Sequence, residues 1–425
     1  MKHILKKVCS LILIFMFLFN FYYTFADDIE YLNDETSISE NTDIYESIEA
    51  SSKDTNALNL NARSCIVLDR LSKKVLYGKN ETSRVKMAST TKIMTATIII
   101  ENCDLNQTVE VSKKAAGTGG SRLGLKTGDK ITIRDLLYGL MLCSGNDAAI
   151  ALAEAAAGSV QDFSKLMNLK AKELGLENTN FESPHGLDSD NHYTTAYELA
   201  ILSDYALKNT TFFNIVGTKS CTVTINGYPK NLNNTNELLG NLNGVYGIKT
   251  GFTNGANRCL VTACKRNNMD IICVVLGCDT KKFRTSDSIK LIEYTFKNFE
   301  YVDISKKIEE EFNRWKLENP NYFNINKGTT NNLELLYSNL EDSILPIKKD
   351  EISFINIQIY INNNFDAPIV KNDVLGRIEV TSNDILISSC DILSANSVEK
   401  KNIIDYTIEF FKNYSNTLNS ITVET

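Results

Sequence analysis

A serine and a lysine three residues apart can act as a nucleophile and its base, because side chains at this spacing share one face of a helix. Three such pairs occur: Ser83/Lys86, Ser89/Lys92 and Ser397/Lys400. Such a lysine must lose its proton readily, which burial among apolar residues favours. Lys92 precedes the apolar residues 93–100, which predict a buried helix, whereas the other two lysines lie in polar stretches. The sequence therefore favours Ser89 and Lys92.

A serine and an asparagine two residues apart would add a proton relay and an amide that can hold a substrate peptide bond. The candidates with this spacing are Ser144/Asn146, Ser189/Asn191 and Ser394/Asn396. The first pair joins two apolar segments that we expect to be helices, residues 135–142 and 147–157, so a short connection would present both side chains. The second pair lies in a polar stretch typical of a surface loop, and we interpret it as structural.

The sequence Lys-Thr-Gly on a strand provides a fixed positive charge, a hydroxyl and a position where backbone can approach a substrate closely. It occurs as Lys126-Thr127-Gly128 and as Lys249-Thr250-Gly251. We favour the second, because it continues an apolar run and precedes two more strand-like runs. An edge strand there would leave N–H groups open for an oxyanion and for substrate backbone.

The three motifs, in this order, are known together in penicillin-binding proteins and class A β-lactamases. The chain resembles the D-alanyl-D-alanine carboxypeptidases of the low-molecular-mass penicillin-binding proteins over about residues 60–300. The similarity is densest in residues 87–95, 135–142, 144–149, 184–187 and 249–253. A weaker resemblance to the family's C-terminal β-domain covers residues 367–371 and 376–378.

This resemblance implies an α/β fold of the penicilloyl-serine transferase type, shared with β-lactamases and transpeptidases. Such a fold has an antiparallel sheet and a helical subdomain, and here a C-terminal β-rich domain follows. The resemblance implies a serine-type carboxypeptidase that removes the terminal D-alanine of peptidoglycan stem pentapeptides through an acyl-enzyme. It also implies covalent binding of β-lactam antibiotics such as penicillin, with no metal and no cofactor.

The resemblance further implies the roles of the reacting groups. Ser89 would be the nucleophile and Lys92 its base, while Ser144 would relay protons and Asn146 would hold the substrate. The oxyanion hole would consist of the backbone N–H groups of Ser89 and Phe252. The family often has histidine where Phe252 stands, and a backbone role is unaffected by that change.

The substrate's terminal carboxylate would meet a second set of groups. Lys249 and Thr250 would face it, and Gly251 would allow the close approach of the strand. Arg284 fits the family's additional carboxylate-binding arginine through a shorter and looser match.

Other functions remain open at this point. A β-lactamase would need a carboxylate-activated water, for which Glu182 is a candidate, but the context of Glu182 resembles the carboxypeptidases. A cell-wall-binding protein without activity is disfavoured by the intact motifs, and an endopeptidase or transpeptidase is poorly separated by sequence. A Ser-His-Asp triad would have to use His185 or His192, yet no G-x-S-x-G elbow accompanies them. We expect both histidines to brace their loop.

The N-terminus predicts export. Three lysines precede the apolar residues 8–19, and residues 24–26 approach a signal-peptidase site, so residues 1–26 read as a signal peptide. An uncleaved anchor is the alternative. Both place the remainder outside the cytoplasm, secreted or attached to the outer face of the cytoplasmic membrane.

The charge of the chain argues against a nucleic-acid partner, and the spacing of its cysteines argues against a zinc site. The net charge is −7, and residues 27–54 alone hold ten acidic residues and one lysine, so we predict a disordered acidic linker over residues 27–56. Without a basic field, nucleic-acid binding is not expected. The ten cysteines show no CxxC spacing, so no zinc site is expected and the nine outside the signal should be mostly buried free thiols.

The order of the expected elements divides the rest of the chain. Strands, a helical block, further strands and a closing helix at residues 289–299 predict one α/β catalytic domain over residues 57–300. Residues 301–395 are Asn-rich with strand-like runs and predict a β-rich domain. Within residues 396–425, an amphipathic helix over residues 400–418 would lie on a membrane surface or pack on its own domain.

Overall fold

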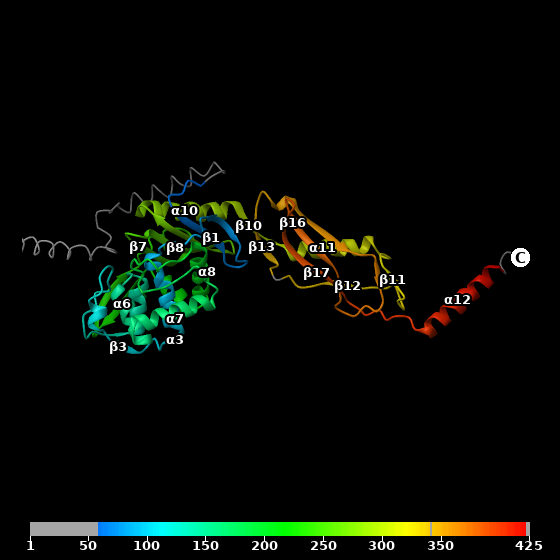
Figure 1. Cartoon of the computed structure of the whole chain (residues 1–425). Helices are drawn as coiled ribbons and strands as arrows, with labels where there is room; N and C mark the ends of the chain where they lie inside the picture. The colour runs from blue at the N-terminus through cyan, green and yellow to red at the C-terminus, as the bar shows by residue number, and fades with distance from the viewer. Residues whose placement is uncertain (1–57, 341, 422–425) are drawn as a thin grey trace, which may run out of the picture. The chain divides into compact units, whose positions relative to one another are not determined.

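The computed structural model describes residues 58–340 and 342–421. The chain divides into two compact units, Met1–Lys297 and Asn298–Thr425, which are described separately (Figure 1). The predicted signal peptide and acidic linker, residues 1–26 and 27–56, lie outside the described residues.

A five-stranded antiparallel sheet forms the centre of the first unit, in the order β2-β1-β9-β8-β7. The strands are β1 (Ser64–Asp69), β2 (Val75–Lys79), β7 (Val245–Thr253), β8 (Asn257–Arg266) and β9 (Met269–Cys278). The middle strands are buried almost without interruption, because helices cover both faces of the sheet. Strand β7 lies at an edge, as the sequence predicted.

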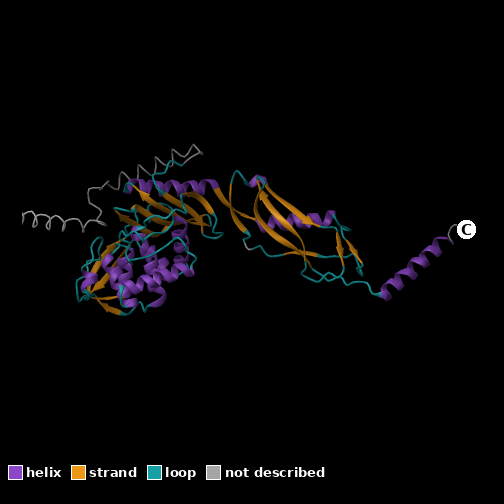
Figure 2. Ribbon diagram, viewed as in Figure 1, coloured by secondary structure: helices purple, strands orange, loops and turns teal. Residues whose placement is uncertain are grey.

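Most helices of this unit gather on one side of the sheet, and α10 lies on the other (Figures 1 and 2). The helices of this unit are α3 (Lys92–Asn102), α4 (Lys113–Ala116), α5 (Ile133–Met141), α6 (Asn146–Ala157), α7 (Val160–Glu173), α8 (Ala196–Leu207), α9 (Thr210–Val216) and α10 (Lys281–Asn298), with the 3-10 turn η2 (Ala88–Thr91) before α3. Two small two-stranded sheets complete the unit: β3 (Thr108–Glu110) with β4 (Lys130–Thr132), and β5 (Ser220–Ile225) with β6 (Tyr228–Asn233). Isolated bridges also join Val85 to Thr194 and Asn180 to Tyr193.

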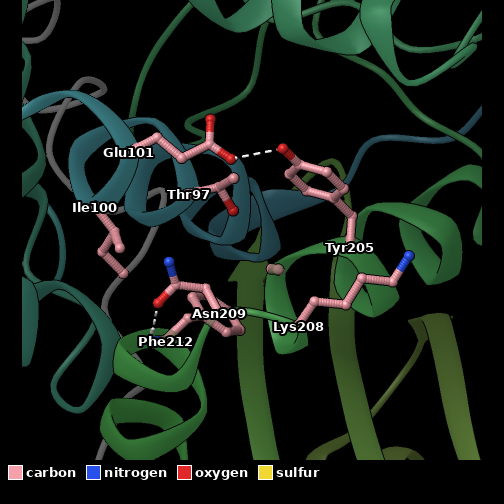
Figure 3. Close-up of a pocket in the computed structure, with 8 residues that line it drawn as sticks. Thr97, Ile100, Glu101, Tyr205, Lys208, Asn209 and Phe212 are labelled. Carbon is pink, nitrogen blue, oxygen red and sulfur yellow. Dashed lines mark hydrogen bonds between the residues drawn. The ribbon is translucent and has the colours of Figure 1, made fainter.

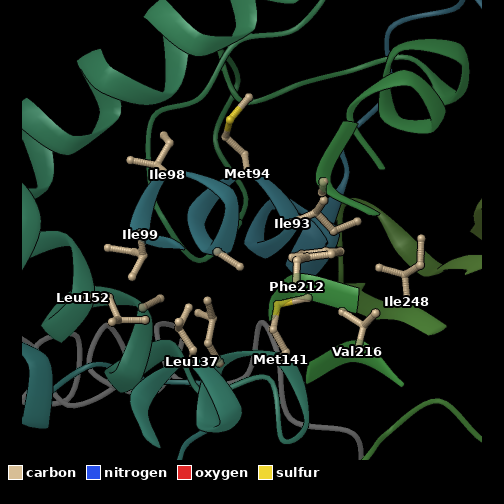
Figure 4. Close-up of a cluster of buried hydrophobic side chains, with 14 of the residues drawn as sticks. Ile93, Met94, Ile98, Ile99, Leu137, Met141, Leu152, Phe212, Val216 and Ile248 are labelled. Carbon is tan, nitrogen blue, oxygen red and sulfur yellow. The ribbon is translucent and has the colours of Figure 1, made fainter. Parts of the chain in front are cut away.

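Helix α3 lies at the centre of the core, and its residues from Lys92 to Ile99 are all buried. The sequence predicted a buried helix here despite its β-branched residues, and this is confirmed. Figure 4 shows its apolar side chains meeting those of α5, α6, α9 and β7. Full burial of one such side chain contributes about 1.5–3 kcal/mol, so this helix is held firmly and can carry a costly polar group.

The helices predicted at residues 135–142 and 147–157 are present as α5 and α6, which begin two residues and one residue earlier than predicted. Helices α5, α7 and α8 each begin after a capping hydroxyl, Thr132, Ser159 and Thr195, which accepts from an N–H of the first turn. The closing helix begins at Lys281, eight residues earlier than predicted. The sequence analysis missed its first turns because they are polar and show little apolar periodicity.

The second unit is β-rich, as predicted. Its main sheet has the order β12-β17-β16-β14, formed by β12 (Leu335–Tyr337), β17 (Ile385–Ser394), β16 (Val374–Ser382) and β14 (Ile355–Ile361). Two further pairs are β10 (Phe299–Asp303) with β13 (Ile344–Lys348) and β11 (Asn324–Asn326) with β15 (Asn364–Asp366).

The sequence analysis missed one helix of this unit, α11 (Ile304–Glu318). Ile304, Ile308 and Phe312 follow one another at four-residue spacing and are buried against the main sheet. That spacing is the signal of an amphipathic helix, and the surrounding charged residues obscured it.

The last helix, α12 (Ile403–Ile421), agrees with the predicted amphipathic segment. Several of its large apolar side chains are exposed, including Ile403 at 83% and Phe410 at 65%. Within the described residues, no helix is both long and apolar enough to cross a membrane.

Candidate active site

Ser89 and Lys92 come together where η2 passes into α3. The Lys92 Nζ lies 2.6 Å from the Ser89 Oγ, and Ser89 is 3% exposed while Lys92 is fully buried. Lys92 is thus buried as its apolar surroundings predicted. Ser83 and Lys86, the competing pair, lie in an irregular segment before this turn.

Two oxygens from distant segments also meet the Lys92 Nζ. The Asn146 Oδ1 lies 2.7 Å away and the carbonyl oxygen of His185 lies 2.9 Å away. Both are acceptors only, so each takes a hydrogen from the lysine. The contact with the carbonyl of His185 was not foreseen, because a backbone group leaves no signature in residue types.

Asn146 is fixed at the first turn of α6. Its N–H donates to the carbonyl of Ser121 at 2.8 Å and its Nδ2 donates to the carbonyl of Gly119 at 2.9 Å, so its Oδ1 must point to Lys92. Ser144 lies on the same α5–α6 connection in a left-handed conformation, with φ of 59°. The structure therefore brings Ser89, Lys92 and Asn146 into contact, and Ser144 lies two residues before Asn146 in the chain.

Asp147 is a site residue to which the sequence analysis gave no role. Its buried carboxylate accepts the N–H groups of Leu123, Gly124 and Leu125 at 2.7–2.9 Å. These bonds hold the segment that contacts Asn146. The signal in the sequence was an aspartate in the first turn of a predicted helix, because such residues often accept backbone N–H groups.

The segment of residues 181–192 packs against η2 and α3. The Thr95 hydroxyl donates to the carbonyl of Pro184 at 2.7 Å. A Cβ at Gly186 would lie 2.0 Å from the carbonyl oxygen of Ala88, and Gly186 has φ of +89°, so only glycine fits there. Its backbone thereby reaches the turn that carries Ser89.

His192 anchors this segment as a neutral ring. The Thr91 hydroxyl donates to the carbonyl of Ala88, so the His192 Nε2, 2.7 Å away, must donate to Thr91. Its Nδ1 accepts the N–H of Glu182 at 3.0 Å. Burial lowers the pKa of His192 to about 4, opposed by Glu182 and Asp188 and supported by Lys92. This is the bracing role that the sequence analysis expected.

The Lys-Thr-Gly motif lies on edge strand β7, directly against the Ser89 turn. A Cβ at Gly251 would lie 3.1 Å from the backbone nitrogen of Ser89, so the strand approaches the turn as closely as backbone allows. The Lys249 Nζ donates to the carbonyl of Thr250 at 2.9 Å, and both side chains are buried. Phe252 follows with its ring under the guanidinium of Arg258, 3.8 Å from the ring centroid.

Lys249 also lies within electrostatic reach of the α5–α6 connection. Burial raises the pKa of the Cys143 thiol to about 11; the Asp147 charge adds to this rise, while the Lys249 charge opposes it. The Lys-Thr-Gly strand lies against the Ser89 turn at Gly251, and the α5–α6 connection reaches the same turn through the contact of Asn146 with Lys92.

Arg284 is 3% exposed on α10, and its Nη2 lies 2.6 Å from the Glu237 Oε1. The Thr285 hydroxyl donates to the same oxygen. Burial alone would raise the pKa of Glu237, but the Arg284 charge and the Thr285 hydrogen bond outweigh it, so this pKa is lowered. The sequence analysis did not foresee this carboxylate partner.

The alternative motifs lie elsewhere in the fold. Lys126 closes a turn before β4, where its carbonyl accepts the N–H of Asp129 at 3.1 Å. Ser189 donates to the carboxylate of Glu182, which is exposed, and Asn191 is exposed beside it. Ser394 and Asn396 belong to the second unit. The interpretation of the Ser189/Asn191 pair as structural agrees with this placement.

A hollow of about 240 Å³ lies between the far end of α3, α8 and α9 (Figure 3). It is smaller than typical ligand pockets of about 300–1,000 Å³, and Glu101 within it is engaged by Tyr205 at 2.7 Å and by Lys170 at 3.0 Å.

Across the described residues, no group of three or more His, Cys, Asp or Glu side chains is arranged to hold a metal ion. The nine cysteines there are free, and six are buried.

The geometry defines a serine–lysine site of the acyl-transfer class. The family model for D-alanyl-D-alanine carboxypeptidases matches residues 50–280, and that for the C-terminal domain of penicillin-binding protein 5 matches residues 318–400. The D-alanyl-D-alanine carboxypeptidase DacF of Bacillus subtilis is 34% identical over 360 residues, covering 83% of this chain and 90% of its own.

Solved structures of a D-alanyl-D-alanine carboxypeptidase and of a penicillin-binding protein also resemble this chain. The carboxypeptidase DacD of Francisella tularensis matches with a TM-score of 0.68 at 26% identity, over 83% of this chain and 98% of its own. Penicillin-binding protein 5 of Haemophilus influenzae matches with a TM-score of 0.65 at 28% identity, over 82% of this chain and 100% of its own. The chain belongs to the D-alanyl-D-alanine carboxypeptidase family, and it is a serine hydrolase with the fold that the resemblance to this family implied.

The neutral His192 makes stability depend on pH. A histidine in the unfolded chain titrates near 6.5, whereas folded His192 titrates near 4. As pH falls from about 6.5 toward 4, His192 binds a proton in the unfolded chain but stays neutral in the folded chain. The free energy of unfolding therefore decreases, by about 2 kcal/mol at pH 5. We expect His192→Gln to reduce the drop in melting temperature between pH 7.5 and pH 5. An equal drop in parent and variant would contradict this.

Proposed function

We propose that the chain removes the terminal D-alanine from peptidoglycan stem peptides, with Ser89 as the nucleophile. The observation that carries the proposal is the position of the buried Lys92 Nζ, within 3 Å of the Ser89 hydroxyl and of two fixed acceptors. The family and the names of the relatives support the same substrate.

The contacts of Lys92 suit a general base. A neutral amine has two hydrogens and one lone pair. The Asn146 Oδ1 and the carbonyl of His185 accept the two hydrogens, so the lone pair faces the Ser89 hydroxyl and can take its proton. Full burial disfavours the ammonium form, which costs several kcal/mol in an interior unless it is well paired.

The reaction then proceeds in two steps. The Ser89 Oγ attacks the carbonyl carbon between the two D-alanines as its proton passes to Lys92. The C–N bond breaks, and the D-alanine nitrogen leaves with a proton returned from the lysine, through Ser144. Water then adds to the acyl ester and releases Ser89, with Lys92 again carrying the proton.

Backbone and side-chain groups position the substrate. The N–H groups of Ser89 and Phe252 stabilise the developing oxyanion, which is the type of interaction that contributes most to such reactions. Asn146 holds the substrate amide. The substrate backbone pairs with the open edge of β7, where Gly251 lets it lie close to Ser89.

The leaving D-alanine carries the carboxylate. Lys249 and Thr250 bind it, and Arg284 adds a second cation. A β-lactam presents a strained amide and a carboxylate at similar positions, so penicillin acylates Ser89 by the same attack. The exposed position of Glu182 gives no support to a β-lactamase in which that residue activates water.

D-Alanine release tests the proposal. We expect the parent protein to release D-alanine from a peptide ending in Lys-D-Ala-D-Ala, and Ser89→Ala to reduce release at least about 10³-fold, because the nucleophile is lost. Ser83→Ala is the matched control from the competing pair and should retain full activity. A folded parent without release, or an active Ser89→Ala protein, would refute the assignment.

We further propose that the enzyme acts outside the cytoplasm and that α12 rests on the membrane surface. The N-terminal sequence supports export. The exposed Ile404, Ile408 and Phe411 lie at spacings of three and four residues along one side of α12, which favours insertion of that side into the headgroup region.

Vesicle sedimentation tests the membrane contact. A chain without residues 1–26 should sediment with phosphatidylglycerol-containing vesicles, since burial of several apolar side chains drives binding. Ile404→Glu with Phe411→Glu should abolish sedimentation. The control Asn413→Glu adds charge to the same helix and should reduce it much less. A parent that stays in the supernatant would contradict this role.

A further inference from the structure

The loop of residues 234–240 is the first part of the connection from β6 to β7, which spans residues 234–244, and it touches three elements of the site. The N–H of Thr235 donates to the carbonyl of Leu142 at the end of α5, at 3.1 Å. The Thr235 Oγ1 lies 2.7 Å from the Thr250 Oγ1 on β7. Glu237 in the same loop binds Arg284 on α10. One short loop therefore joins Thr250 to Arg284, the two groups assigned to the terminal carboxylate along with Lys249.

The ion pair between Glu237 of this loop and Arg284 of α10 is largely buried. The side chain of Arg284 is 4% exposed and that of Glu237 is 19% exposed, with 2.6 Å between the Nη2 and the Oε1. The Thr285 hydroxyl adds a further donor to the same oxygen. Removing one partner of a buried pair leaves an uncompensated charge, so the other partner must move or be destabilised.

The Glu237–Arg284 ion pair also restricts the direction in which the Arg284 guanidinium points. A guanidinium is a planar fork whose N–H groups point outward at set angles, so holding one nitrogen restricts where the others can point. Glu237 thereby determines the orientation of the Arg284 fork. Through the same loop it also holds Thr235 against the Thr250 hydroxyl.

We propose that Glu237 is a positioning residue that sets how strongly the site prefers a peptide ending in a free carboxylate. It acts by holding Arg284 and the 234–240 loop in place, and it does not touch the reacting atoms. This inference rests on the proposed function and deepens it.

The test compares two peptides that differ only at the end, Lys-D-Ala-D-Ala and its C-terminal carboxamide. In Glu237→Ala we expect the KM for the free acid to rise about tenfold, equivalent to one weakened charged contact. The kcat for both peptides and the KM for the carboxamide should change less than about twofold. Glu237→Gln keeps an oxygen acceptor for Arg284 and Thr285, so it should recover most of the lost selectivity.

A matched ion pair provides the control. Glu293 lies on α10, as Arg284 does, and binds Arg266 at 2.7 and 2.9 Å in a pair that is somewhat more exposed. Its partner, Arg266, is not one of the proposed site groups. Glu293→Ala should lower the melting temperature without changing the ratio of the two KM values. A purely structural role for Glu237 predicts the same behaviour as Glu293.

Two outcomes overturn the proposal: a folded Glu237→Ala protein with an unchanged KM ratio, or equal losses on both peptides. A parent that releases no D-alanine refutes the proposed function instead. The preference for a free carboxylate is then measured as the ratio of the acylation rates with benzylpenicillin and with its methyl ester. An unchanged ratio in folded Glu237→Ala again overturns the role of Glu237.

Discussion

A lysine amine buried in the core imposes the strongest demand on this fold. Lys92 is fully buried at the start of α3, and an amine in that position needs partners for its hydrogens and for its lone pair. The partners come from η2, from the first turn of α6 and from the segment of residues 181–192. Each of these segments is held in turn by buried bonds, those of Asp147 and His192 among them. The apolar packing around α3 outweighs the cost of this polar centre.

The second constraint is the close approach of backbone to backbone around Ser89. The turn is held between Gly186 on one side and Gly251 of β7 on the other, where a side chain would collide with Ala88 or press on Ser89. Such close contact leaves N–H groups of the turn and of the strand edge near one another. The proposed oxyanion hole depends on this arrangement, and so does the pairing of a substrate with β7.

Much of the site could be predicted because its chemistry resides in short motifs. Ser89 and Lys92 were separated from rival pairs by the apolar run that follows them, and Lys249 by its place on a strand, and both placements hold in the fold. The carbonyl of His185 could not be predicted, since any residue provides one. The Glu237–Arg284 pair spans 47 positions, and no local pattern links the two. Helix α11 was missed because charged residues surround its three buried positions.

The central claim is that Lys92 activates Ser89, and mass spectrometry of the penicillin adduct tests it most directly. Incubation with benzylpenicillin should place one acyl group on the peptide that contains Ser89. Lys92→Met keeps the length of the side chain and removes the amine, and should slow this acylation at least about 10³-fold. Lys86→Met, the control from the competing pair, should leave it unchanged. An adduct on another residue, or acylation of folded Lys92→Met at the parent rate, would contradict the account.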